Sequence, residues 1–370
     1  MKAILSPLLV ACSLLLLTQC HPLKEQHTTT PPIQQVKPRN VILLIGDGMG
    51  LSQITAGLYS NHNRLQIERF KQIGFHKSYS SDDLVTDSAA GATAFSCGKK
   101  TYNGAIGVDP DTIPCKTLLE EAEDHGLATG LVATSTIVHA TPASFIAHNP
   151  YRRNYEAIAG DFPGSGIDYF VGGGLKFFQN REKDDRNICE ELRKEGYLIQ
   201  DYFTNDINLI QPDPKRPFGF LTANEDPLTA ENGRDYLLPA AQAGLTFLKQ
   251  RSSKGFFMMI EGSQIDWGGH ATNSQYIVTE MLDFDKVIGD ALDFAQANPG
   301  TLVILTADHE TGGYSIIEGS RMDSLVTAFT TKGHSASLIP VFAFGPGAEQ
   351  FQGIYENTAI YDKIMALMGW

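Results

Sequence analysis

Residues 41–50 read VILLIGDGMG, an apolar run that ends at a glycine-flanked aspartate. Short apolar runs bounded by turn residues are typical of buried parallel strands. Ligands of open α/β sheets bind at the carboxyl ends of such strands. Four more apolar runs lie close to Asp, Glu, His or Thr: 127–133 before His139 and Thr141, 256–260 before Glu261, 301–305 before Asp308, and 339–344 after His334. The sequence therefore predicts one metal-rich site assembled from distant segments of one sheet.

The sequence between these runs predicts an α/β fold, because strand-like and helix-like stretches alternate. We expect a central, mostly parallel sheet flanked by helices on both faces. A chain of 370 residues can form one large or two ordinary domains. The least readable region is 176–235, whose charged stretch 180–186 and proline-containing stretch 211–214 predict a small surface insertion over the sheet edge, a candidate dimer element.

The formal charge of −13 argues against a surface that binds nucleic acid or an anionic membrane. It does not exclude a small anionic substrate, because bound metal ions reverse the local sign of charge.

The first 20 residues are typical of an export leader, because Lys2 precedes an apolar stretch too short to span a membrane comfortably. The segment 17–20 resembles a lipoprotein processing box, which makes Cys20 a candidate lipid anchor, although Gln19 is bulkier than usual there. Simple secretion and lipid anchoring both stay open. Residues 21–38 are polar and predict a flexible tether. We expect an exported protein, periplasmic or secreted.

Three cysteines, Cys97, Cys115 and Cys189, follow the leader. This odd count allows at most one internal disulfide plus one free thiol. Their spacing does not match a zinc finger, so thiolate metal binding is not expected.

Two glycine-containing motifs resemble nucleotide-binding motifs but have the wrong spacing. Residues 46–50 would need a glycine in place of Leu51 to match the dinucleotide fingerprint. Residues 98–101 end like a P-loop, but that motif needs a glycine where Thr93 stands and a hydroxyl where Lys100 stands. Neither motif supports a nucleotide cofactor.

Residues 86–94, TDSAAGATA, predict a helix that begins at Asp87 or Ser88 and packs tightly through its small side chains. A hydroxyl at that position meets backbone N–H groups and the positive end of the helix dipole. Ser88 is therefore either an ordinary helix cap or a nucleophile placed to receive a phosphoryl group.

Two further segments supply metal ligands. Residues 261–270 contain Glu261, Asp266 and His270, and the last two are four apart, so one helical turn or a compact loop could direct both at one ion. Residues 308–310 add Asp308 and His309 after a strand. Carboxylate with imidazole suits Zn²⁺, whereas an all-oxygen set suits Mg²⁺. With His334, the clusters predict a two-metal hydrolytic site.

From residue 39 to the end, the chain resembles the alkaline phosphatases. The matching segments, in the family's order, are 47–50, 86–90, 141–143, 261–270, 308–310 and 333–334. The resemblance implies a single catalytic domain over 39–370, of the compact type found in cold-living bacteria, with 176–235 as a variable insertion. It also implies a homodimer, a broad range of small phosphate monoesters as substrates, inorganic phosphate as product and an alkaline optimum.

The resemblance assigns Ser88 as the phosphorylated nucleophile and Arg152, rather than Arg153, as the clamp on phosphate oxygens. Two Zn²⁺ and one Mg²⁺ per subunit are expected. The implied ligands are Asp266, His270 and His334 for one zinc, Asp47, Asp308 and His309 for the other, and Asp47, Thr141 and Glu261 for magnesium.

Two positions depart from the enteric bacterial pattern. His139, a candidate metal ligand, replaces an Asp, and Trp267, a candidate substrate-binding residue, replaces a Lys. Cold-adapted members share both changes. The departures leave the zinc ligands intact but affect the expectation for the third metal site.

Two alternatives stay open. A related phosphodiesterase or sulfatase would use the same metal scaffold, and a noncatalytic phosphate-binding or metal-storage protein would need no Ser88. The Asp87–Ser88 pair with Arg152 favours monoesters, because a second ester group would clash with that Arg or leave it unused. The predicted mechanism is a two-step phosphoryl transfer through a phosphoserine.

Overall fold

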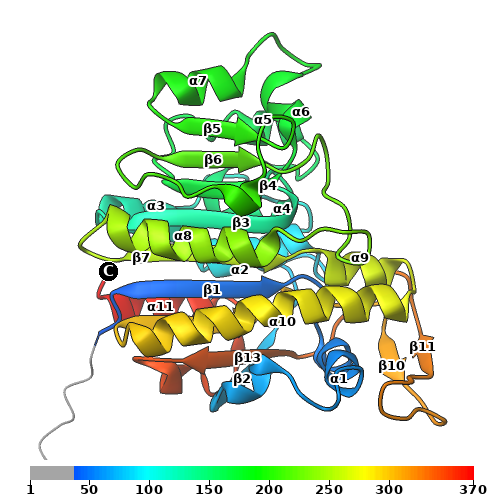
Figure 1. Cartoon of the computed structure of the whole chain (residues 1–370). Coiled ribbons are helices and arrows are strands. Elements are labelled where there is room, and N and C mark those ends of the chain that lie inside the picture. Colours follow the sequence, from blue (N-terminus) through cyan, green and yellow to red (C-terminus); the bar gives the residue numbers. More distant parts are fainter. Residues whose placement is uncertain (1–36) are drawn as a thin grey trace, which may run out of the picture. The chain divides into compact units, whose positions relative to one another are not determined.

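A computed structural model describes residues 37–370, so the predicted leader, Cys20 and nearly all of the predicted tether lie outside the described residues. The central element of the described part is a ten-stranded sheet (Figure 1). From one edge to the other its strands are β14 (Gly353–Glu356), β2 (Gln72–Lys77), β13 (Ile339–Phe344), β8 (Thr301–Thr306), β1 (Asn40–Gly46), β7 (Phe256–Gly262), β3 (Ala128–Thr136), β4 (Tyr169–Gly173), β6 (Phe218–Leu221) and β5 (Leu198–Asp201).

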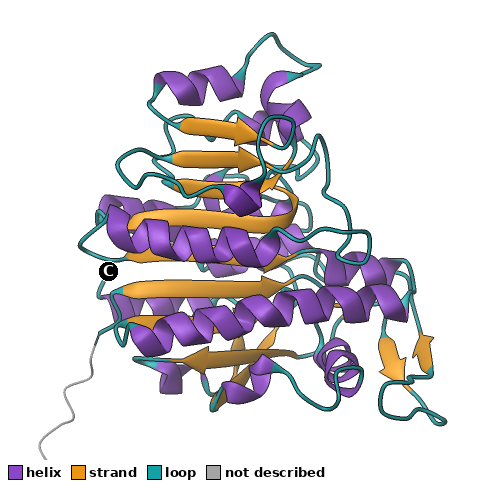
Figure 2. Ribbon diagram, in the orientation of Figure 1, coloured by secondary structure: helices purple, strands orange, loops and turns teal. Residues whose placement is uncertain are grey.

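Helices cover both faces of this sheet, which confirms the predicted α/β architecture (Figure 2). One face carries α2 (Ser88–Cys97), α3 (Leu118–Asp124), α4 (Ala140–Ile146), α5 (Tyr155–Ala159), α6 (Leu175–Gln179), α7 (Ile188–Lys194) and α11 (Ala359–Met368). The other face carries α1 (Leu51–Tyr59), α8 (Leu237–Arg251) and α10 (Ser274–Ala297), with α9 (Gln264–His270) at its end.

Strand β1 shows why the sheet has two hydrophobic cores. Its side chains alternate, so Val41, Leu43 and Ile45 pack into the core on one face. Ile42 and Leu44 pack into the core on the other. A strand buried on both sides needs apolar residues at every position, which is the continuous run seen in the sequence.

The strand direction corrects one prediction. Four of the five apolar runs are parallel neighbours, β8, β1, β7 and β3. The fifth, β13, is antiparallel to β8. Its amino end therefore lies at the same edge of the sheet as the carboxyl ends of the other four. This direction explains why His334, which precedes its strand, can join ligands that follow theirs.

The region 176–235 contributes β5 and β6 to the sheet, both parallel to their neighbours. It therefore extends the sheet at one edge. The remaining elements are two short antiparallel pairs, β9 (Glu310–Thr311) with β12 (His334–Ser335) and β10 (Tyr314–Ile316) with β11 (Thr327–Phe329), and the 3-10 turns η1 (Gln66–Arg69), η2 (Ile207–Leu209) and η3 (Ala348–Phe351). Across the described residues, the helices are all too short or too polar to cross a bilayer.

Candidate active site

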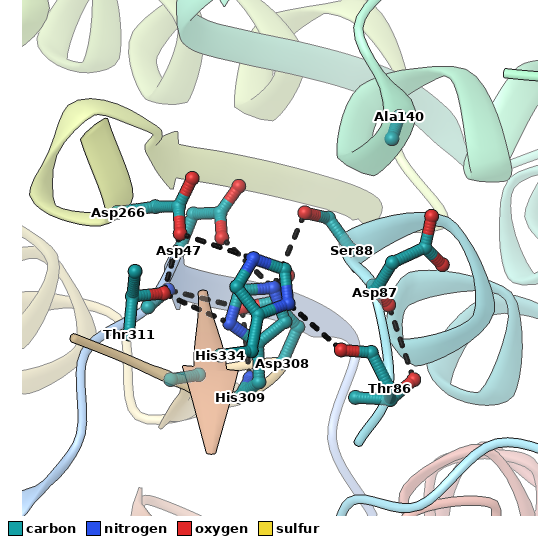
Figure 3. A network of polar contacts seen from close by, with 12 residues as sticks. Asp47, Thr86, Asp87, Ser88, Ala140, Asp266, Asp308, His309, Thr311 and His334 are labelled. Atoms are coloured by element: carbon teal, nitrogen blue, oxygen red, sulfur yellow. Dashed lines mark hydrogen bonds and ion pairs between the residues drawn. The ribbon is translucent and has the colours of Figure 1, made fainter. Parts of the chain in front are cut away.

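Predicted ligands come together at the edge where β1, β7 and β8 end, and Figure 3 shows Asp47, Asp266, Asp308, His309 and His334 among them. Asp47 follows β1 directly, and Asp308 and His309 follow β8 after one intervening residue. His309 Nε2 lies 3.4 Å from Asp47 Oδ1 and 3.2 Å from Asp308 Oδ2. All three residues are fully buried. This carboxylate–carboxylate–imidazole triad has the spacing of a group that could hold a metal ion.

A second group forms around Asp266. Helix α9 places this residue and His270 one turn apart, with His270 Nε2 3.2 Å from Asp266 Oδ2. His334 Nε2 lies 3.5 Å from Asp266 Oδ1 and 3.2 Å from His270 Nε2. The Nδ1 atom of each imidazole is held by a backbone carbonyl, that of Lys332 for His270 and that of Thr86 for His334. These contacts direct both Nε2 atoms toward the same carboxylate, as a shared cation requires.

A third group lies deeper, around Glu261 at the end of β7. Its Oε2 accepts a 2.6 Å hydrogen bond from Ser263, whereas its Oε1 is buried without a partner. The Thr141 hydroxyl and His139 Nδ1 are likewise buried without hydrogen bonds. Ligand atoms of Asp47, His139 and Glu261 lie within 4.8 Å of one another. Buried polar atoms without partners are rare, so this group fits a bound cation.

Helix α2 places Ser88 beside these groups. Asp87 is its N-cap and accepts a 3.0 Å hydrogen bond from the backbone N–H of Ala90. This position puts Ser88 in the first turn of the helix, with its Oγ 3.3 Å from His309 Nε2. The predicted helix start is confirmed. The hydroxyl thus meets both the positive end of a helix dipole and the metal-ligand cluster.

Two glycines permit this close assembly. A Cβ on Gly91, inside α2, would lie 3.0 Å from the Cβ of Asp308, so the helix could not approach the end of β8 as closely. Gly48 has φ +70°, and a Cβ there would lie 2.8 Å from the Cα of Asp266. A side chain at either position would separate elements that carry ligands.

Arg152 reaches the site from a loop after α4. Its Nη1 donates to Asp87 Oδ2 at 2.8 Å, and its Nη2 lies 3.4 Å from His139 Nε2. Burial alone would lower the pKa of the guanidinium, but the Asp87 carboxylate outweighs burial and raises it. Burial and the nearby Arg152 lower the pKa of His139 to about 3, so its imidazole is neutral near pH 7. Of Arg152 and His139, Arg152 therefore carries the positive charge.

The carboxylates of the site carry more negative charge than the chain neutralises. Burial, with the charges of Asp308 and Asp266, raises the pKa of Asp47 well above its usual range. Burial also raises the pKa of Glu261 to about 8 and, with the charge of Asp266, that of Asp308 to about 6. Carboxylates placed so close together are stable in the ionised form only with added positive charge. Divalent cations would supply it.

A cleft of about 420 Å³ opens onto Ser88. Trp267 lines it, with its ring edge-on to His139 at a centroid distance of 6.0 Å. Arg152, Arg153 and Tyr155 also face this cleft. The predicted nucleophile and clamp therefore line one cleft together with four of the predicted ligands, His139, Asp266, His270 and His334. His148 does not, because it is held between the Gly107 carbonyl and Glu120 in a structural role.

One contributor to the site, Thr311, was not predicted from the sequence. Thr311 donates a hydrogen bond to Asp266 Oδ1 and so holds a predicted ligand, but an uncharged residue gives little signal in a search for ligands. Glu310 stands between His309 and Thr311 yet points away from the ligands. It accepts hydrogen bonds from Gln53, Gly313, Tyr314 and Ser335. Side chains alternate between the two faces of a strand, so this pattern could have predicted that Glu310 faces away from its neighbours His309 and Thr311.

Comparison with known proteins decides the family. The alkaline phosphatase family model matches residues 38–326. The chain belongs to the alkaline phosphatase family. It is 34% identical to alkaline phosphatase 3 of Bacillus subtilis (strain 168), over 88% of each chain. It is 29% identical to the alkaline phosphatase of Escherichia coli (strain K12), over 90% of this chain and 86% of that protein.

Among solved structures, the alkaline phosphatase of the Antarctic bacterium TAB5 superposes with a TM-score of 0.86 at 47% identity. The superposition covers 91% of this chain and 99% of that one. A His-to-Asp mutant of the TAB5 enzyme has Mg bound in its M3 site. This chain is therefore an alkaline phosphatase, a hydrolase of phosphate monoesters with a metal-binding site.

Proposed function

We propose that this alkaline phosphatase hydrolyses phosphate monoesters in two steps through a phosphoserine on Ser88. The observation that carries the proposal is the position of the Ser88 hydroxyl, in the first turn of α2 and 3.3 Å from His309 Nε2, at the cleft shared with Arg152. If Ser88 served only as a helix cap, its position beside a group of buried carboxylates would have no function. The N-cap role is moreover filled by Asp87.

The donor sets support two zinc ions and one magnesium ion. Asp266, His270 and His334 would hold one zinc, and Asp47, Asp308 and His309 the other. Asp47, Thr141 and Glu261 would hold magnesium, with His139 beside them. A nitrogen ligand is unusual for magnesium, so His139 makes this the site most open to another ion.

The bound ions would supply Lewis-acid stabilisation of the Ser88 alkoxide and of the leaving oxygen. Ser88 Oγ forms a bond to phosphorus as the bond from phosphorus to the ester oxygen breaks, and an alcohol leaves. Water then displaces Ser88 Oγ from phosphorus, which releases inorganic phosphate and regenerates the hydroxyl. The positive end of α2 favours the anionic phosphoryl group throughout.

Arg152 would bind the phosphoryl oxygens whose bonds to phosphorus do not break during the reaction. Its guanidinium can donate two parallel hydrogen bonds to a phosphoryl group, and its ion pair with Asp87 fixes its direction. A monoester presents oxygens for this fork, whereas a diester replaces one of them with a second ester group. The clamp thus favours monoesters over diesters. Trp267 lies on the wall of the same cleft and would contact bound substrate.

Several further properties belong to the proposal. The site grips phosphate and leaves the rest of a substrate in an open cleft, which supports a broad range of small monoesters. An alkaline optimum follows if product release becomes faster as the site loses protons.

The leader-like segment 1–20 supports export, by secretion or through a lipid on Cys20. We also infer a homodimer and a single catalytic domain over 39–370.

Trapping the intermediate tests the proposal. Wild-type enzyme mixed with radiolabelled phosphate monoester and quenched in acid should retain label on Ser88. Ser88→Ala should retain none, while Ser60→Ala, at the far end of α1, should label like wild type. Undiminished labelling of Ser88→Ala would refute the nucleophile assignment.

Rates on a nitrophenyl monoester should also exceed those on the diester, and the opposite preference would identify a phosphodiesterase.

A further inference from the structure

Two of the three cysteines in the described part of the chain lie against each other. Cys97 is the last residue of α2, and Cys115 lies in the segment that leads to α3. Cys97 Sγ is 3.2 Å from the carbonyl oxygen of Cys115. The proximity of the two thiols raises the pKa of Cys97 and lowers that of Cys115. Both residues are buried, with 5% and 6% of their surfaces exposed.

Cys189 is placed differently. It lies on α7, on the far part of the sheet, and burial raises the pKa of its thiol to about 12. The sequence allowed one internal disulfide plus one free thiol but did not say which pair forms. The geometry selects Cys97 and Cys115 and leaves Cys189 as the free thiol.

We propose that Cys97 and Cys115 form a disulfide when the folded protein meets a small-molecule disulfide such as oxidised glutathione. The thiolate of Cys115 attacks one sulfur of the donor and expels a donor thiolate. The thiolate of Cys97 then attacks Cys115 Sγ and expels the second donor group. Two protein thiols become one disulfide, and the donor disulfide becomes two thiols that take up the two protons.

The order of the two attacks follows from the contact between the thiols. Cys97 Sγ lies against the backbone of Cys115, and the nearby Cys97 thiol lowers the pKa of Cys115, which favours the thiolate form of Cys115. A thiolate, and not a thiol, is the attacking species. The sulfur atoms then close to the disulfide bond length of about 2.0 Å.

The cross-link would secure the segment that supports the phosphate site. Between the two cysteines, Asn103 Oδ1 accepts a 2.9 Å hydrogen bond from the backbone N–H of Asp87. The Gly104 carbonyl accepts one of 2.8 Å from the backbone N–H of Arg152. The same segment is therefore in contact with the N-cap of the Ser88 helix and with the clamp. A disulfide would fasten it to the other end of that helix.

Closing this loop restricts the unfolded chain, so the oxidised enzyme should resist heat better than the reduced enzyme. For a loop of this length in a domain of this size, the melting temperature should rise by about 5 °C. Turnover at low temperature should change little, because neither sulfur faces the cleft.

Peptide mapping of the full chain tests the pairing. The enzyme is incubated with oxidised or reduced glutathione, alkylated and digested with trypsin, which cuts after Lys99 and Lys100 and so separates the two cysteines. The oxidised sample should contain peptide 78–99 joined to peptide 101–116, and a reductant should separate them. Cys189 should be alkylated in both samples.

Matched variants test the consequence. The melting temperature should rise on oxidation in wild type and in Cys189→Ser, but not in Cys97→Ser or Cys115→Ser. Alkylated Cys97 and Cys115 in the oxidised sample, or either one joined to glutathione or to another cysteine, would overturn the pairing. A joined peptide without any gain in melting temperature would overturn the stabilising role. The mapping needs only wild-type protein, so poor folding of a variant leaves the pairing testable.

Discussion

Two buried charged clusters in this enzyme differ in whether side chains of the chain neutralise their carboxylates. Around Arg234, two acids share one guanidinium: Glu280 accepts from it at 2.6 Å and Asp283 at 2.9 Å. Lys286 lies 3.6 Å from the second acid, so charges of both signs balance. Around Asp47, by contrast, the buried carboxylates contact no Lys or Arg among the described residues. A cluster neutralised within the chain stabilises the fold, whereas one left unbalanced is a place for added cations.

The largest expected effect comes from removing charge at the unbalanced cluster. Asp47→Asn should lower kcat/KM by about 10³-fold, because this residue serves two of the proposed metal sites. The metal-free form should be no less stable than metal-free wild type, since an uncompensated buried carboxylate is costly. Activity assays and thermal melts after chelation measure both. A strong loss of stability without metal would show that Asp47 is structural.

The balanced cluster should behave in the opposite way. Arg234→Met leaves Glu280 and Asp283 buried without their partner and should reduce the free energy of unfolding by about 3–5 kcal/mol. Activity per folded molecule at low temperature should stay within about twofold of wild type, because the change is outside the site. Denaturant titration gives the first quantity. A large loss of kcat in fully folded protein would mean that the two clusters are coupled.

The clamp gives a smaller effect. Arg152→Lys keeps the positive charge but cannot donate two parallel hydrogen bonds to the phosphoryl group, so kcat/KM for a monoester should fall by about 10- to 100-fold. Arg153→Lys is the matched control, because Arg153 lines the same cleft and makes no ion pair or hydrogen bond among the described residues. It should change kcat/KM by less than about threefold. Equal losses in both variants would shift the clamp role to the pair.

The smallest effect concerns a polar group far from the ligands. Burial raises the pKa of Glu123 to about 7 from an ordinary 4.5, with Asp168 adding to the rise and Arg251 opposing it. The folded protein therefore retains a proton that the unfolded chain releases between these pH values, so this group destabilises the fold as pH rises through that window.

Glu123→Gln removes this titration. Its melting temperature should exceed that of wild type by about 1–3 °C at pH 8 and match it near pH 4.5. Parallel melts of the two proteins at both pH values measure the difference. A gain of equal size at both pH values would assign the effect to packing.

The sequence predicted much of this arrangement because two kinds of signal are local. Continuous apolar runs mark strands buried on both faces, and Asp47 or Asp308 shortly after such a run marks the edge of the sheet. The direction of β13 was predicted wrongly, because an apolar run reads the same whichever way its strand points. Only pairing with β8 shows that His334 reaches the site from the amino end of its strand.

Other features depend on contacts between distant segments. The salt bridge from Arg152 to Asp87 and the hydrogen bond from Thr311 to Asp266 join residues that lie far apart in the sequence. The proximity of Cys97 to Cys115 is of the same kind. The ligand sets and the phosphoserine remain predictions that chemistry has to test.

Metal analysis with activity on one preparation tests the central claim most directly. The enzyme is purified, dialysed and assayed for bound metals by elemental analysis, alongside hydrolysis of a nitrophenyl monoester. We expect about two zinc ions and one magnesium ion per chain, loss of activity in proportion to zinc removed by a chelator, and recovery when zinc is restored. Full activity in protein free of divalent metal would contradict the account.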